Sequence, residues 1–341
     1  MSISNRHIVL SKRPDGYPKH DDFALSESQL SAPQDGEFIT KNLYVSLDAG
    51  FRNWMNESAG DDVLPALPLG EPVMGLTLAK VIESKHADYQ EGDMMMARFA
   101  WEEYSKSDGS DFIARLPREL NFPYSYYLGL LGDTGMSAYF GLTEIAIPKP
   151  GETVLVSAAG GAVGSIAGQI AKILGARAVG ISSSEEKCQR LIDELGYDAA
   201  VNRKSEEGLE AAIAAACPDG VDVYFDNVGG ETLQAAITNL TLGARVALCG
   251  SITHYNADTP APGPSNLFDL VTKEVTMRGF LTHFREDRYD QARQQLENWV
   301  SEGKLKNIEY CLEGVEQIGV AFCDMFNGKN FGKTVVRLSD E

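Results

Sequence analysis

Apolar and polar residues alternate with a period of two in the first third of the chain, which is typical of β-strands. Leu43, Val45 and Leu47 follow this pattern, residues 76–82 form another apolar run, and a run of methionines follows the Gly-Asp turn at residues 92–93. Pro, Gly and Asp interrupt the pattern throughout this region. We therefore expect short strands that form a small, partly open β-barrel.

From about residue 124 onward, strand-like apolar runs alternate with helical segments. We expect strands at residues 154–157, 178–181, 199–201, 221–225, 245–248 and 275–280. We expect helices in a stretch of small residues that ends at Leu174 and at residues 185–195, 206–216 and 231–240. Six strands that alternate with helices predict one doubly wound parallel sheet. A last strand at residues 333–338 is expected to rejoin the N-terminal domain.

Residues 154–187 carry the most specific pattern: a strand, a glycine-rich turn, a helix and a second strand. This arrangement binds dinucleotides, because it places a helix N-terminus against the pyrophosphate. Gly161 and Gly164 match the second and third glycines of the G-x-G-x-x-G motif, while Ala159 stands at the first. Alanine there requires a more relaxed turn, and the other two glycines keep their roles.

A membrane helix is an alternative reading of part of this segment. Gly160, Gly164 and Gly168 form a G-x-x-x-G ladder in an uncharged stretch. That stretch covers only residues 153–171 and contains Gln169. A spanning helix needs about twenty strongly apolar residues, so the dinucleotide site is favoured.

Composition excludes several classes of protein. With 341 residues, 43% of them hydrophobic and 23% charged, the chain is long enough for two globular domains. A net charge of −19 argues against a nucleic-acid surface, and the N-terminus shows no secretory signal. The five cysteines include no C-x-x-C pair, which favours reduced thiols and a cytoplasmic location.

The residues after the second strand of the dinucleotide motif favour NADPH over NADH. An NAD site usually has a carboxylate at this point, whereas this chain has Ser182-Ser183-Ser184. Lys187 and Arg203 are candidate ligands of a 2′-phosphate. The alternative is that both are ordinary solvated side chains.

Several motifs together resemble the zinc-free branch of the medium-chain dehydrogenase/reductase superfamily, the branch of alkenal, prostaglandin/leukotriene and curcumin reductases. They span nearly the whole chain in the order of the family. The motifs are residues 46–48, 135–142, 159–165, 226–230, 249–252, 255–256 and 329–333.

The resemblance implies a GroES-like β-barrel domain at residues 1–124 and 308–341, a Rossmann NADPH-binding domain at 125–307, and the active site in the cleft between the two. It also implies a set of cofactor-binding residues. The pyrophosphate would lie on Gly161, Ala162, Val163 and Gly164, and the 2′-phosphate on Lys187 and Arg203. The nicotinamide half would lie near Met136, Ser137, Asn227, Cys249, Ser251, Tyr255, Phe280, Thr282 and Asn330. Asn227 is alternatively a turn residue and Cys249 a small core residue.

No metal site is expected. No cysteine precedes Cys188, and the first half contains only three histidines. Residues 68–75 stand where the zinc-dependent branch has Gly-His-Glu, and they contain no histidine. Zinc sites depend on thiolate, imidazole and carboxylate ligands. Hydride addition to an activated C=C bond is easier without a Lewis acid than alcohol oxidation, because hydrogen bonds can hold the enolate charge.

Tyr255 is the candidate catalytic residue, as a hydrogen-bond donor to the carbonyl oxygen of the substrate. The alternative is a loop tyrosine that only bonds the ribose or covers the pocket. Many relatives carry a second tyrosine in a Ser-Leu-Asp-Pro-Tyr-Met-Arg stretch, and Gly50 takes its place here. Four aromatic residues are candidates for an apolar pocket or for ordinary core positions: Trp54, Trp101, Tyr104 and Phe284.

The sequence thus predicts an NADPH-dependent reductase that transfers hydride to the β-carbon of an α,β-unsaturated aldehyde or ketone. The family suggests a homodimer that pairs Rossmann sheets edge to edge. The apolar strand at residues 275–280 is compatible with this pairing, and an edge protected by a loop is the alternative. A quinone reductase of the same superfamily and a non-catalytic NADPH-binding module are the alternatives. Neither a nucleic acid nor a membrane is expected as a partner.

Overall fold

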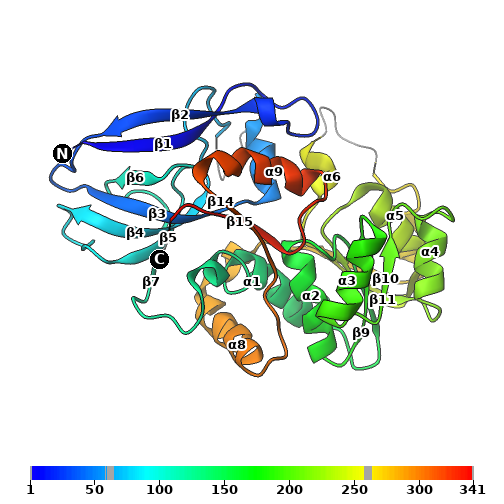
Figure 1. The fold of residues 1–341 in the computed structure, drawn as a ribbon. Helices are drawn as coiled ribbons and strands as arrows, with labels where there is room; N and C mark the ends of the chain where they lie inside the picture. The colour runs from blue at the N-terminus through cyan, green and yellow to red at the C-terminus, as the bar shows by residue number, and fades with distance from the viewer. Residues whose placement is uncertain (1, 58, 60–64, 257–262, 340–341) are drawn as a thin grey trace. The chain divides into compact units, whose positions relative to one another are not determined.

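The computed structural model describes residues 2–57, 59, 65–256 and 263–339 (Figure 1). The chain divides into two compact units. The first contains Met1–Leu128, Tyr310–Lys329 and Thr334–Glu341, and the second contains Gly129–Glu309 and Asn330–Lys333. Among the described residues, no helix has both the length and the apolar character needed to cross a membrane.

The first unit is built on antiparallel β-structure, as the alternating pattern predicts. Strands β1 (Ile3–Leu10) and β2 (Phe23–Leu30) form a pair of their own. A larger sheet has the order β14-β15-β3-β4-β5-β7, with β6 also paired to β3. Its strands are β3 (Phe38–Ser46), β4 (Leu76–Ser84), β5 (Met94–Ala97), β6 (Tyr104–Ser107), β7 (Ile113–Leu116), β14 (Glu309–Glu313) and β15 (Lys333–Arg337). The C-terminal strand β15 thus lies beside β3.

Trp101 belongs to the core of this first unit and not to an aromatic pocket. Its ring centroid lies 5.6 Å from that of Phe23 and 5.3 Å from that of Phe322 on α9 (Ile318–Phe326). Trp54 packs against the same cluster and against the ring of Phe51. The pocket reading of Trp101 is therefore wrong, because its indole is almost fully buried among apolar side chains.

The second unit contains the predicted six-stranded parallel sheet. Its order is β10-β9-β8-β11-β12-β13, the order 3-2-1-4-5-6 of dinucleotide-binding sheets. The strands are β8 (Thr153–Val156), β9 (Arg177–Ser182), β10 (Ala199–Asn202), β11 (Val221–Asp226), β12 (Leu240–Leu248) and β13 (Thr276–Gly279). Residues 153–171 form β8, a turn and most of a helix, so the membrane reading is wrong.

Helices precede, connect and follow these strands along the chain (Figure 1). They are α1 (Asp133–Phe140), α2 (Ala162–Ile173), α3 (Glu185–Leu195), α4 (Leu209–Ala216), α5 (Gly230–Thr238) and α8 (Tyr289–Ser301). Helix α3 begins and ends where the sequence predicts. The Ser184 side chain accepts a hydrogen bond from the backbone N–H of Lys187 at 3.3 Å, and Gly196 ends the helix with φ of 71°.

Other boundaries differ from the prediction for local reasons. Helix α4 begins at Leu209 and not at residue 206, because Gly208 has φ of 87°. Helix α5 ends at Thr238, since β12 already begins at Leu240. In the sequence, Pro260, Pro262 and Pro264 predict an extended loop at residues 253–270, whereas the structure has parts of two short helices there, α6 (Ile252–Tyr255) and α7 (Phe268–Thr272). Pro260 and Pro262, which suggested the loop, lie outside the described residues.

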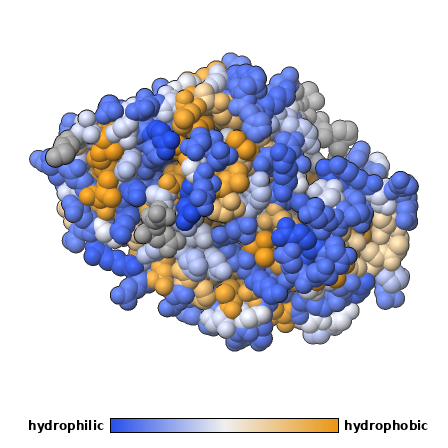
Figure 2. Space-filling model, viewed as in Figure 1, coloured by the Kyte–Doolittle hydropathy of each residue, from blue (hydrophilic) through white to orange (hydrophobic). Residues whose placement is uncertain are grey.

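Figure 2 shows a face that is mostly hydrophilic, with apolar side chains in small groups. The sequence contains 49 acidic and 30 basic residues, which gives the chain its net charge of −19.

Candidate functional site

The turn between β8 and α2 is shaped for an anion. Gly164 has no room for a side chain, because a Cβ there would lie 2.3 Å from the carbonyl oxygen of Ala158 and 2.7 Å from Cα of Ala159. Gly161 precedes α2, and no side chain caps this helix. The backbone N–H groups of the first turn, at residues 162–164, are thus available to a phosphate.

The strained residue of the turn is not the one that the motif suggests. Ala159, at the position of the first glycine, is buried, and its N–H donates to the carbonyl of Ile181 at 2.9 Å. Its neighbour Ala158 has the positive φ of 47°. The sequence contains no signal for this, since alanine seldom adopts such a conformation.

A segment near the C-terminus is bonded to the same turn. The N–H of Gly332 donates to the carbonyl of Gly160 at 2.8 Å, and Gly161 and Gly332 form a parallel bridge. Asn330 is buried beside this contact, and its amide donates to the carbonyl of Gly332. The structure therefore places Asn330, which the sequence assigns to the nicotinamide half, in a segment that lines the phosphate turn.

Two basic residues lie beside the end of β9 without an acidic partner. Lys187 is partly buried in the first turn of α3, and the backbone N–H of Arg203 donates to the carbonyl of Ser182 at 2.8 Å. Among the described residues, no carboxylate forms an ion pair with either side chain. Burial, together with the positive charges of Arg190 and Arg203, lowers the pKa of Lys187 to about 8 against the opposing effect of Glu186.

Asp226 organises the carboxyl end of the sheet. Its Oδ1 accepts hydrogen bonds from the Ser157 hydroxyl at 3.0 Å and the Tyr224 hydroxyl at 2.7 Å. The N–H groups of Val228 and Gly229 also donate to this oxygen, each at 3.0 Å. The Asp226 side chain thus fixes the loop after β11.

Asn227 and Cys249 are held next to this carboxylate. The Asn227 side-chain amide donates to the carbonyl of Ser157 at 2.8 Å, and the N–H of Cys249 donates to the carbonyl of Asp226 at 2.8 Å. Burial raises the pKa of the Cys249 thiol to about 12, although a hydrogen bond with the Ser137 side chain lowers it. The thiol is therefore protonated at neutral pH and unsuited to act as a nucleophile.

Tyr255 ends the short helix α6 with its hydroxyl near the loop after β12. A Cβ on Gly250 would lie 3.6 Å from this hydroxyl oxygen. Burial raises the pKa of the Tyr255 phenol, although a hydrogen bond with the Ser251 backbone lowers it. The phenol is a proton donor at neutral pH. The neighbouring imidazole of His254, which sequence reasoning did not single out, contacts the Ser251 hydroxyl.

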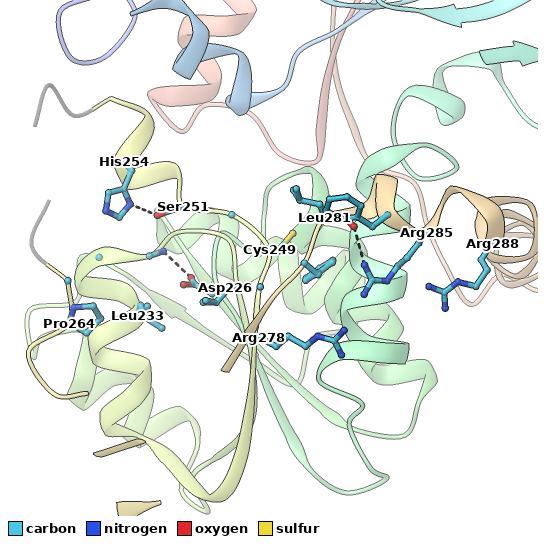
Figure 3. A pocket seen from close by; sticks show the side chains of 18 residues that line it. Asp226, Leu233, Cys249, Ser251, His254, Pro264, Arg278, Leu281, Arg285 and Arg288 are labelled. Atoms are coloured by element: carbon cyan, nitrogen blue, oxygen red, sulfur yellow. Dashed lines mark hydrogen bonds between the residues drawn. The ribbon is translucent and has the colours of Figure 1, made fainter. Parts of the chain in front are cut away.

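A cavity of about 870 Å³ opens in the second unit at the ends of β11, β12 and β13 (Figure 3). Cys249, Ser251 and Phe280 line it, as the sequence-based site requires, together with Asp226 and His254. Arg278, Arg285 and Arg288 line its opposite part. Glu144 bonds both Arg285 (2.9 Å) and Arg288.

The remaining predicted residues do not line this cavity. The Met136 side chain is fully buried in α1, and Thr282 lies at the start of the 3₁₀ segment Thr282–Arg288. No group of three or more His, Cys, Asp and Glu side chains suited to a metal ion exists in the described part of the chain.

Four features fit a phosphorylated dinucleotide. Gly164 has no space for a side chain, so none can cover the start of α2. The N–H groups of the first turn of α2 are open to a phosphate. Lys187 and Arg203 supply positive charge beside the end of β9. The last residue of this strand is Ser182, which carries no carboxylate.

Comparison with known proteins gives matches over nearly the whole chain. Residues 6–114 match a family model described as the N-terminal domain of oxidoreductase, and residues 162–298 match one described as zinc-binding dehydrogenase. The chain is 39% identical to the NADP(+)-dependent 2-alkenal reductase of Nicotiana tabacum over 99% of both chains. It is 35% identical to the NADPH-dependent curcumin reductase of Escherichia coli, over 99% of this chain and 98% of that one.

A solved structure agrees with these sequence matches. The crystal structure of CurA from Vibrio vulnificus in complex with NADPH superimposes with a TM-score of 0.90 at 37% identity. The superposition covers 98% of this chain and 100% of the other.

Proposed function

We infer the function from the premise that this chain belongs to the medium-chain dehydrogenase/reductase family, in the branch of the alkenal, curcumin and prostaglandin reductases. The protein is an NADPH-dependent oxidoreductase that reduces the C=C bond of α,β-unsaturated aldehydes or ketones. The full-length identity to NADP-dependent reductases carries this conclusion. The unpaired cations beside the glycine turn supply the chemical reason for the phosphorylated cofactor.

We assign the cofactor contacts as follows. The N–H groups at the start of α2 bind the pyrophosphate, and Lys187 and Arg203 bind the 2′-phosphate. Asn227 and the backbone at Cys249 and Ser251 face the nicotinamide half, where the bound cofactor supplies a hydride. The protein's own contribution is to orient the ring and to exclude water through the buried loop that Asp226 fixes.

Tyr255 is the proposed catalytic residue. Hydride addition at the β-carbon moves negative charge onto the carbonyl oxygen of the substrate, and a hydrogen bond to that oxygen stabilises it. Burial keeps the Tyr255 phenol protonated, so it is available as this donor. The α-carbon then takes a proton from solvent, which completes the saturated carbonyl product.

We also propose a homodimer joined along the edge of the parallel sheet. Strand β13 is the last strand of the sheet, and most of its residues are exposed. Exposed apolar side chains precede it on α7 and follow it, with Phe268 73% and Phe284 75% exposed. The unpaired backbone groups of an exposed edge strand can pair with the same strand of a second copy, and the apolar side chains beside it can pack across that interface.

The five cysteines are free, which supports the proposed cytoplasmic location. We retain residues 125–307 as the proposed NADPH-binding domain.

The test of the function is NADPH oxidation against a panel of enals, enones and quinones, with NADH in parallel and with identification of the product. We expect saturated carbonyl products and a preference for NADPH. Turnover of quinones alone would assign the chain to a quinone reductase. Tight NADPH binding without turnover of any acceptor would indicate a binding module, with Gly50 in place of the family tyrosine as its first suspected cause.

A further inference from the structure

A cationic and an aromatic side chain meet beside the phosphate turn. The guanidinium carbon of Arg190 lies 3.9 Å from the ring centroid of Phe331, a cation–π contact. Arg190 is on the second turn of α3, whereas Phe331 belongs to the short C-terminal segment that is bonded to the glycine turn. Both residues lie in the second unit.

Phe331 in turn packs against the glycine turn itself. Its side chain is only 4% exposed. A Cβ on Gly160 would lie 3.2 and 3.3 Å from two ring carbons of Phe331, so the ring occupies the space beside this glycine. The next residue, Gly332, donates its N–H to the carbonyl of Gly160 at 2.8 Å. This bond fixes the orientation of the Gly160 carbonyl. If the carbonyl oxygen pointed towards the start of α2, it would repel a phosphate bound there.

The Arg190 side chain is itself held in one orientation. Its Nε donates to Oε1 of Glu194 at 2.6 Å, and its terminal nitrogen donates to Oε2 at 3.1 Å. A bidentate pair of this kind fixes the plane of the guanidinium. Glu194, Arg190, Phe331 and Gly160 therefore form a continuous series of contacts from α3 to the turn.

We propose that Arg190 is a positioning residue for the dinucleotide, which acts through Phe331 on the phosphate-binding turn. The proposal rests on the proposed NADPH function. Lys187 and Arg203 are assigned to the 2′-phosphate, a group that NADH lacks. The turn binds the pyrophosphate, which both cofactors share, so Arg190 contributes to the binding of NADPH and NADH alike.

The test is the dissociation constant of each cofactor, measured by fluorescence titration of the protein without substrate. Arg190→Met keeps most of the aliphatic stem and removes the charge and the planar group. We expect it to weaken the binding of both NADPH and NADH by a factor of about two to five, the value of one cation–π contact.

Four further variants test whether the effect passes through Phe331. Phe331→Leu should weaken both cofactors, and the double variant Arg190→Met/Phe331→Leu should be no weaker than Phe331→Leu alone. Glu194→Gln should cause a smaller loss in the same direction. Arg203→Met, the matched loss of a nearby arginine, should weaken NADPH and leave NADH unchanged. A thermal melt of each variant without cofactor separates these effects from loss of folding.

A loss confined to NADPH in Arg190→Met would overturn the proposal, because Arg190 would then act on the 2′-phosphate. Unchanged affinities, or additive effects in the double variant, would overturn it as well. Failure of the proposed function is recognised separately, since wild-type protein would then bind no NADPH or reduce no enal.

Discussion

Lys187, the proposed ligand of the 2′-phosphate, is partly buried, and its surroundings lower its pKa. Its pKa is lowered from 10.5 to about 8 by burial and by two neighbouring arginines. Below this pH the free protein carries the ammonium that a 2′-phosphate needs. Above it, binding must include the uptake of a proton, so the affinity falls as the pH rises.

We therefore expect the dissociation constant of NADPH to rise above pH 8, by up to about tenfold per pH unit. Lys187→Arg should give a flat profile over the same range, since a guanidinium keeps its charge. Lys187→Ala should weaken NADPH by about tenfold or more, the value of a charge-assisted hydrogen bond, and leave NADH unchanged. Titrations at pH 7 to 9.5 measure all three. The same slope in wild type and Lys187→Arg would assign the titration to another group.

Tyr255→Phe tests the proposed hydrogen bond to the substrate carbonyl. We expect kcat to fall by about a hundredfold, as for other lost donors to a developing oxyanion. The dissociation constant of NADPH should change little. Steady-state kinetics with one enal and a cofactor titration give both values. A rise in that constant with unchanged kcat would instead assign Tyr255 to the cofactor ribose.

At the scale of elements, the turn between β8 and α2 depends on close approach of the backbone at Gly164. A methyl group there would meet the Ala158 carbonyl oxygen at 2.3 Å, so Gly164→Ala must displace the turn. We expect a loss of about 1–3 kcal/mol in stability and weakened binding of both cofactors. Gly50→Ala is the matched control, because nothing lies within 4 Å of its Cβ position. Thermal melts and titrations should separate the two variants.

Local signals explain which elements the sequence predicts well. Helix α3 has a serine cap at its start and a left-handed glycine at its end, and both are visible as residue types. The start of α4 was misplaced because Glu206 and Glu207 favour a helix while Gly208 has a positive φ. The true start of β12 at Leu240 depends on pairing with β11, which no local pattern reveals.

At the scale of the whole molecule, the proposed dimer makes a direct prediction. Phe268→Glu places a charge among the exposed apolar residues that precede β13. We expect the mass measured by light scattering to fall from twice the 37.1 kDa of one chain to that of a monomer. Leu25→Glu, an exposed apolar residue of β2 in the first unit, is the control and should remain dimeric. A monomeric wild type would exclude the dimer.

The sequence by itself determined the succession of strands and helices along the second unit, the glycine spacing at the phosphate turn and the absence of a carboxylate after β9. These features lie within about thirty residues of one another or follow from the periodicity of apolar side chains. Tertiary structure decided the rest. Phe331 and Arg190 contact each other beside the turn although they lie far apart in the sequence. Trp101 packs in the core of the first unit, and the positive φ of the turn occurs at Ala158. Such contacts depend on which apolar surfaces pack together, and a local pattern cannot specify its distant partner.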